Sequence, residues 1–150
     1  MTTSLRILIV EDEILIALEL ESLLQDAGHE VVGIAACADE AISMGKDLDP
    51  DLAFVDIHLA DGPTGVEVAR QLAGRQGVMV LFMTANAKRI PDDFAQAHGV
   101  IAKPYTERGV KQALDYILAI ASGRPDLPVA ETMTFVPFTR RTTTSDSPLQ

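Results

Sequence analysis

The chain has 150 residues, of which 47% are hydrophobic and 23% charged, as expected for one globular domain with a buried core. Its formal net charge of −10 argues against direct nucleic-acid binding, which needs a concentrated positive surface, and against an anionic membrane surface as partner. The single cysteine, Cys37, excludes an internal disulfide, and neither a membrane-spanning run nor a secretory signal is evident, so a cytoplasmic location is the default expectation.

Short apolar segments alternate with amphipathic ones along most of the chain. The apolar segments are typical of buried strands, whereas the others carry apolar residues at helical spacing. Ala17, Leu20, Leu24 and Ala27, for example, share one face of a helix that Gly28 ends. In chain order, the pattern predicts strands at 5–10, 31–36, 52–55, 78–83 and 100–102. The helices that follow the first four strands are predicted at 14–27, 38–48, 66–72 and 88–98, the last of these with Pro91 inside it. A final helix follows the fifth strand, with an apolar stripe made of Val110, Ala113, Leu114, Ile117, Leu118 and Ala121.

Five consecutive strand–helix units predict an α/β fold, a doubly wound parallel sheet with helices on both faces. The strands are apolar almost throughout, which agrees with burial on both sides. We therefore expect one domain over residues 1–122.

The segment 123–150 has a different character, with four prolines and a run of threonine and serine. It is predicted to be an extended tail and not an independent domain. Residues 133–138 (MTFVPF) nevertheless hold two of the five phenylalanines. This patch either covers apolar surface of its own domain, binds a partner, or is exchanged between two subunits.

Chemically useful side chains follow four of the five predicted strands. Glu11 and Asp12 follow the first strand, Asp56 the third, Thr84 the fourth and Lys103 the fifth. Because ligands of open parallel sheets bind beyond the carboxyl ends of the strands, we expect these side chains to converge.

Three converging carboxylates repel one another unless a cation neutralises them, and Mg²⁺ suits all-oxygen ligands. An aspartate beside Mg²⁺ is a plausible nucleophile toward phosphorus, while Lys103 offers positive charge and Thr84 a hydroxyl donor. Taken singly, each residue has an ordinary structural explanation, such as a helix cap, a turn or a solvated surface lysine. Their joint placement at successive strand ends predicts phosphoryl transfer to Asp56.

The sequence resembles the receiver domains of bacterial two-component response regulators over about residues 5–122. The motifs that carry the resemblance are Ile9-Val10-Glu11-Asp12-Glu13, Ala53-Phe54-Val55-Asp56, Phe82-Met83-Thr84-Ala85 and Ile101-Ala102-Lys103-Pro104-Tyr105. It implies a flavodoxin-like five-stranded sheet of order 2-1-3-4-5. It also implies that the phosphoryl donor is a histidine kinase or a histidine phosphotransfer protein.

The resemblance also implies a role for each site residue. Glu11 and Asp12 would be metal-binding acids, Asp56 the phosphoacceptor and a metal ligand, and His58 the donor of a backbone carbonyl to Mg²⁺. Thr84 would be the switch hydroxyl, and Lys103 would contact the phosphate. His58 and Asn86 stand at positions that tune the lifetime of the phosphoaspartate.

Three features depart from the usual family pattern. Val100 stands where most receivers have an aromatic switch residue. Residues 82–85 partly match a subgroup of stand-alone receivers with a Phe-Ala-Thr-Gly motif, which also lack that aromatic residue. Ala60 replaces the usual proline after the phosphoacceptor, and a longer loop follows at 61–65, so we expect an altered metal loop.

The leading hypothesis is a single-domain response regulator whose output runs through protein contacts or phosphoryl relay, with no turnover substrate. The alternative is a pseudo-receiver, a binding module that phosphorylation does not switch. A phosphatase with an aspartyl-phosphate intermediate is disfavoured, because such enzymes usually carry two aspartates at the first strand end. A homodimer through the last helix is a further hypothesis, since Tyr116 and Ile120 lie off its apolar stripe.

Overall fold

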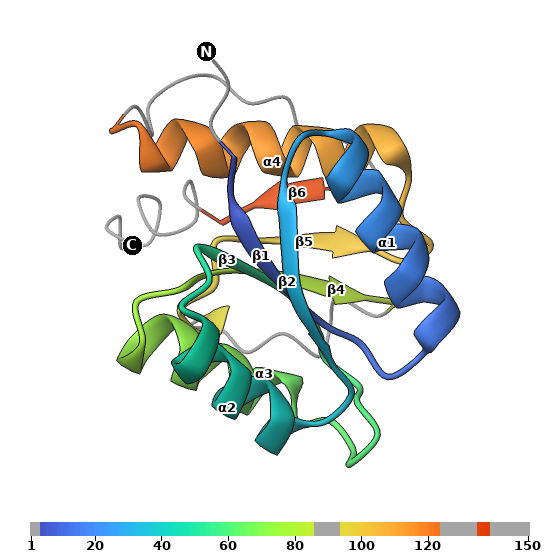
Figure 1. The fold of residues 1–150 in the computed structure, drawn as a ribbon, viewed down its shortest axis with the longest axis vertical. Coiled ribbons are helices and arrows are strands. Elements are labelled where there is room, and N and C mark those ends of the chain that lie inside the picture. Colours follow the sequence, from blue (N-terminus) through green and yellow to red (C-terminus); the bar gives the residue numbers. More distant parts are fainter. Residues whose placement is uncertain (1–3, 86–93, 124–134, 139–150) are drawn as a thin grey trace, which may run out of the picture.

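The computed structural model describes residues 4–85, 94–123 and 135–138. Its centre is a six-stranded sheet of order β2-β1-β3-β4-β5-β6, in which the first five strands are parallel. Helices α1 and α4 cover one face, and α2 and α3 cover the other (Figure 1). No helix among the described residues is long and apolar enough to span a membrane.

The elements agree closely with the predicted strand–helix alternation, including the 2-1-3-4-5 order of the parallel strands. In chain order they are β1 (Arg6–Val10), α1 (Ile14–Asp26), β2 (Glu30–Ala35), α2 (Ala38–Leu48), β3 (Leu52–Asp56), α3 (Gly65–Ala69), a π-helical turn (Arg70–Arg75), β4 (Met79–Thr84), a 3₁₀ turn (Phe94–Gln96), β5 (Gly99–Ala102), α4 (Glu107–Ala121) and β6 (Phe135–Pro137).

Both faces of the sheet are buried because successive side chains of a strand point to opposite sides. In β3, Ala53 and Val55 pack on the α2/α3 face, whereas Leu52 and Phe54 pack on the α1/α4 face. All five residues of β3 are buried. This explains why the central strands are apolar throughout and do not alternate with polar residues.

The predicted helix over 88–98 is wrong for the part of it that the structure describes. Residues 88–93 lie outside the described residues, and the remainder holds only the 3₁₀ turn Phe94–Gln96. Ala95 and Gln96 have φ angles of 49° and 66°, in the left-handed region that cannot continue an α-helix. The backbone N–H of His98 then donates to Val80 O (2.8 Å), which draws the chain into the sheet.

The sixth strand was not predicted. β6 pairs antiparallel with β5, and its Phe135 is fully buried. Of the three alternatives for the aromatic patch, the structure therefore shows the first, in which the patch covers apolar surface of its own domain.

The packing of β6 corrects one argument for a dimer. Tyr116 is only 4% exposed and its ring lies 5.7 Å from that of Phe135. Ile120 is also partly buried against the α1/α4-face core. Tyr116 lies off the predicted stripe because it packs under β6, so it is not available to a second subunit.

Candidate functional site

The carboxyl ends of β1, β3, β4 and β5 bring the predicted side chains to one edge of the sheet. Glu11, Asp12 and Asp56, here called the acidic cluster, each offer a carboxylate oxygen within 4.8 Å of the others. Glu11 and Asp56 are buried, whereas Asp12 is exposed. The expected convergence of three carboxylates is confirmed.

Lys103 bridges two members of the acidic cluster. Its Nζ lies 2.9 Å from Glu11 Oε1 and 3.0 Å from Asp56 Oδ2. The backbone N–H of Lys103 donates to Thr84 O (2.9 Å), so the ends of β4 and β5 hold the lysine in register with the cluster. The structure thus joins the predicted cation directly to the predicted nucleophile.

The electrostatic state of the cluster reflects its burial. Burial raises the pKa of the Glu11 carboxyl to about 7, with a further upward contribution from the charge of Asp56, although the hydrogen bond from Lys103 opposes it. Burial alone would lower the pKa of Lys103, but its hydrogen bonds to Glu11 and Asp56 outweigh this and raise it. Two buried carboxylates thus share a single lysine, so ionisation of the whole cluster is favoured by an additional cation.

The chemistry of these donors fits Mg²⁺. Three carboxylates supply hard oxygen ligands, and the exposed Asp12 leaves one side of the cluster open to water and to a phosphoryl oxygen. The cluster faces an open cavity of about 520 Å³ whose lining includes Asp12, Asp56, His58, Thr84 and Lys103. This space is sufficient for a metal ion and a phosphoryl group together.

The loop after Asp56 folds back on the strand that carries it. The N–H of His58 donates to Asp56 Oδ1 (3.2 Å), and the N–H of Gly65 donates to Ile57 O (2.9 Å). A Cβ atom at Gly65 would lie 2.1 Å from Asp56 O, so only glycine allows this approach. The Asp61 carboxylate accepts from Thr64 Oγ1 (2.6 Å) and from Ala38 N (3.3 Å), which ties the loop to α2.

The structure places the other predicted residues as follows. His58 is exposed at the rim of the cavity, and Thr84 is 6% exposed at the end of β4. Val100 packs in the α2/α3-face core and pairs with Val136 of β6. Asn86 lies outside the described residues.

Sequence reasoning missed two residues that support the site, Gly65 and Tyr105. In the sequence, Gly65 is only part of the loop 61–65, because the sequence does not show that this residue contacts the backbone of Asp56. Tyr105 Oη donates to Ile16 O (2.9 Å) and holds the segment after Lys103 against α1. Of these, only Tyr105 had a sequence signal, since it directly follows Lys103-Pro104 in a quoted motif.

Two further histidines have structural roles away from the acidic cluster. His29 is only 8% exposed, and its Nδ1 accepts the N–H of Leu5 (3.0 Å). His98 Nδ1 accepts the N–H of Val80 (3.4 Å). Burial lowers the pKa of both imidazoles, in keeping with neutral rings that act as acceptors.

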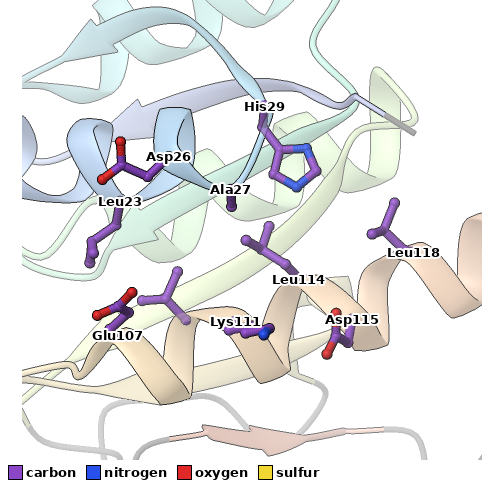
Figure 2. A pocket seen from close by; sticks show the side chains of 10 residues that line it. Leu23, Asp26, Ala27, His29, Glu107, Lys111, Leu114, Asp115 and Leu118 are labelled. Carbon is purple, nitrogen blue, oxygen red and sulfur yellow. The ribbon is translucent and has the colours of Figure 1, made fainter. Parts of the chain in front are cut away.

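A second cavity lies between α1 and α4, and none of its lining residues belongs to the acidic cluster (Figure 2). Its volume is about 400 Å³. Leu23 of α1 and Ala27 just after it face Leu114 and Leu118 of α4, and His29 also lines the cavity. Predicted site residues are absent from its lining, so it adds nothing to the proposed chemistry.

Comparison with known proteins gives consistent results. A family model described as the response regulator receiver domain matches residues 7–115. The phyllosphere-induced regulator PhyR of Methylorubrum extorquens is 36% identical over 114 residues, which cover 75% of this chain and 43% of that protein. The transcriptional regulatory protein PdtaR of Mycobacterium tuberculosis is 31% identical over 104 residues, covering 67% of this chain and 50% of that protein.

Solved structures show the same likeness. The response regulator PhyR from Brucella abortus superposes with a TM-score of 0.72 at 30% identity, covering 81% of this chain and 50% of that one. The receiver (REC) domain of Erythrobacter litoralis PhyR gives 0.69 at 32% identity, covering 85% and 97%. The chain thus spans about half the length of its PhyR and PdtaR relatives, but nearly all of an isolated receiver domain.

Proposed function

The chain belongs to the response regulator receiver family, and from this premise we propose that it is a phosphorylation switch that accepts a phosphoryl group on Asp56. The observation that carries the proposal is the ion-paired arrangement of Lys103 with Glu11 and Asp56 at the carboxyl edge of the sheet. A receiver domain is a signalling module, so the reaction takes place on the protein's own side chain and has no turnover substrate.

The proposed reaction is the transfer of a phosphoryl group from a phosphohistidine. A carboxylate oxygen of Asp56 attacks phosphorus, an O–P bond forms as the P–N bond breaks, and the imidazole keeps the electron pair and takes up a proton. The ammonium group of Lys103 lies 3.0 Å from Asp56 Oδ2, where it would neutralise charge on the phosphoryl oxygens. The Thr84 hydroxyl, at the end of the neighbouring strand, would donate to one of those oxygens.

Mg²⁺ would be held by Glu11, Asp12 and Asp56, with the backbone carbonyl of His58 as a further ligand. When bound, it would neutralise the negative charge that gathers as the phosphoryl group approaches the carboxylates. The side chains of His58 and Asn86 are proposed to set how readily water reaches the phosphoaspartate.

A histidine kinase or a histidine phosphotransfer protein is the proposed donor. The start of α1, directly after Glu11 and Asp12, exposes Ile14, Leu15 and Leu18, which are 57%, 78% and 47% exposed. A protein that brings a phosphohistidine to Asp56 could cover this apolar surface. We further propose a cytoplasmic location, and an output through protein contacts or phosphoryl relay.

The test is the intact mass of the protein after incubation with acetyl phosphate and Mg²⁺. We expect the unmodified chain to gain one phosphoryl group, about 80 Da, and Asp56→Asn to gain none. Asp115→Asn, which changes an exposed aspartate of α4, is the matched control and should gain the group as the unmodified chain does.

The opposite outcome would be equally informative. If neither acetyl phosphate, phosphoramidate nor a phosphorylated histidine kinase adds a group to the unmodified chain, the phosphorylation switch is refuted. The alternative, a pseudo-receiver that acts as a binding module, would then be favoured.

A further inference from the structure

The edge of β5 is filled by a segment from far along the chain. β6 pairs antiparallel with β5, with Gly99 opposite Pro137, Val100 opposite Val136, and Ile101 opposite Phe135. The N–H of Phe138 extends the ladder by donating to His98 O (3.0 Å). Four residues of this segment thus pair with one side of β5, whose other side pairs with β4.

The two aromatic side chains of this segment reach opposite faces of the sheet. Phe135 is fully buried on the α1/α4 face, where its ring lies 5.7 Å from that of Tyr116. Phe138 is 6% exposed and packs on the α2/α3 face together with Val100. Burial of the two rings stabilises the pairing and opposes the entropic cost of ordering the segment.

Gly99 leaves the space that this segment occupies. A Cβ atom there would lie 2.9 Å from Phe135 Cε1 and 3.0 Å from the carbonyl oxygen of Val136. The third-nearest atom would be Leu81 Cδ2 of β4, at 3.3 Å, the end of a flexible side chain. The lack of a side chain at Gly99 is therefore needed mainly for the close approach of β6, and less for the packing of β5 on β4.

The proline of the segment fits the ladder because of its position. In an antiparallel pair, backbone N–H groups point alternately toward and away from the partner strand. Phe138 donates inward to His98, so the nitrogen of Val136 also points inward and that of Pro137 points outward. Proline costs no hydrogen bond at 137, but it would remove one at 136.

The β5 edge does not depend on β6 for its own place in the sheet. All four residues of β5 pair with β4, through Leu81 to Thr84. β6 is only three residues long and is attached through the residues after α4, so it can leave while the five parallel strands stay paired.

We propose that the β5 edge is a recognition site for an extended segment of a partner protein with aromatic residues at its first and fourth positions. β6 is the resident intramolecular occupant, and it competes with that partner. Main-chain pairing supplies part of the affinity, and the pockets for the two rings on opposite faces supply specificity. The site uses none of the acidic cluster, so it goes beyond the proposed phosphorylation and does not depend on it.

The first experiment frees the edge by changing one residue of the full chain. Val136→Pro removes the inward N–H of β6 but keeps both phenylalanines, whereas Val136→Ala keeps the N–H and is the matched control. The probe is a fluorescein-labelled peptide with the sequence of residues 133–140, MTFVPFTR, followed by fluorescence anisotropy. We expect the Val136→Pro chain to bind it at least about tenfold more tightly than the Val136→Ala chain, because the resident strand no longer competes.

Two controls identify the site. The same peptide with proline in place of its valine should not bind, because it lacks the inward N–H. Adding Gly99→Val to the Val136→Pro chain should abolish binding. In NMR spectra, the peptide should shift the amide signals of Gly99 to Ile101 in the Val136→Pro chain and not in the Val136→Ala chain. A folded Val136→Pro chain that binds neither peptide, or binds equally well with Gly99→Val, would overturn the proposal.

A second measurement needs no variant. We expect the Phe138 amide of the unmodified chain to exchange its hydrogen at least about a hundredfold faster than the Phe54 amide in β3, because β6 opens locally. If both amides exchange only by global unfolding, β6 is a permanent strand and the edge is not a recognition site. This result decides the question even where Val136→Pro prevents folding.

Discussion

At Gly65, the absence of a side chain decides how the loop after Asp56 closes. The start of α3 lies against the backbone that follows β3, and a Cβ atom there would be 2.6 Å from Ile57 Cα as well as 2.1 Å from Asp56 O. Backbone atoms cannot turn aside as the end of a flexible side chain can. Any larger residue must therefore push α3 and Asp56 apart.

We predict that Gly65→Ala destabilises the fold by about 3 kcal/mol and also slows phosphorylation by acetyl phosphate. Urea unfolding and intact mass measure the two effects. The matched control is Gly33→Ala, whose Cβ would have three side-chain atoms as its nearest neighbours: Leu48 Cδ1 and Met44 Sδ at 3.2 Å, and Leu8 Cδ1 at 3.6 Å. This substitution should cost less than about 1 kcal/mol. Equal losses from the two substitutions would contradict this account.

The residues that meet at the site were predictable because their chemistry and their position are both local properties. Glu11, Asp12, Asp56, Thr84 and Lys103 each follow a recognisable strand, and parallel strands end at a common edge. The roles of Gly65 and Tyr105 could not be predicted, because each depends on which distant backbone atoms come near. The sequence predicted that Lys103 would lie near the carboxylates, but not that its Nζ would contact both Glu11 and Asp56.

Among the elements, His98 joins three strands. Its N–H and Nδ1 both bond to the backbone of Val80, and its carbonyl oxygen accepts from Phe138. A second proton on the imidazole would point an N–H group at the N–H of Val80. Burial lowers the pKa of His98 below its ordinary value of 6.5 and outweighs the opposing effect of the backbone of Val80.

This arrangement predicts a loss of stability in acid. Above pH 6.5 the ring is neutral in both states, whereas at lower pH the unfolded chain takes up a proton that the folded chain resists. The loss grows as the pH falls from 6.5 and levels off below the folded pKa. His98→Asn keeps an acceptor without titrating, so in urea unfolding the unmodified chain should lose more stability than this variant between pH 7.5 and pH 5. The same pH dependence of stability in both proteins would refute this role of His98.

The elements that sequence patterns failed to predict are short and depend on context. β6 has three residues, one of them proline, so no periodicity distinguishes it from a loop, and its burial comes from Tyr116 and β5. The 3₁₀ turn at Phe94–Gln96 ends where two residues adopt left-handed backbone angles that their side chains do not favour. The longer strands and helices have enough residues for their apolar pattern to be decisive.

For the molecule as a whole, the net charge of −10 and the acidic cluster make cations stabilising in two distinct ways. Any salt screens the general self-repulsion, whereas Mg²⁺ bound at the cluster, as proposed, would add binding energy to the folded state alone. We predict that Mg²⁺ at about ten times its Kd raises Tm by roughly 3–6 °C above NaCl of equal ionic strength.

The control for this prediction is Asp12→Asn, because Asp12 is exposed and its loss leaves the core intact. The excess stabilisation by Mg²⁺ should nearly disappear in this variant. An equal excess in both proteins would place the stabilising ion elsewhere.

The two borders of the sheet have a consequence for the behaviour of the protein at high concentration. At the β6 border, the strand is only three residues long and Pro137 has no N–H to point outward. At the β2 border, the register against β1 shifts between Ile7 and Leu8, a bulge that twists the strand away from flat pairing. Neither border is a long, regular template for a seventh strand, so the sheet resists growing from one molecule into the next and the native protein is protected from amyloid-like association.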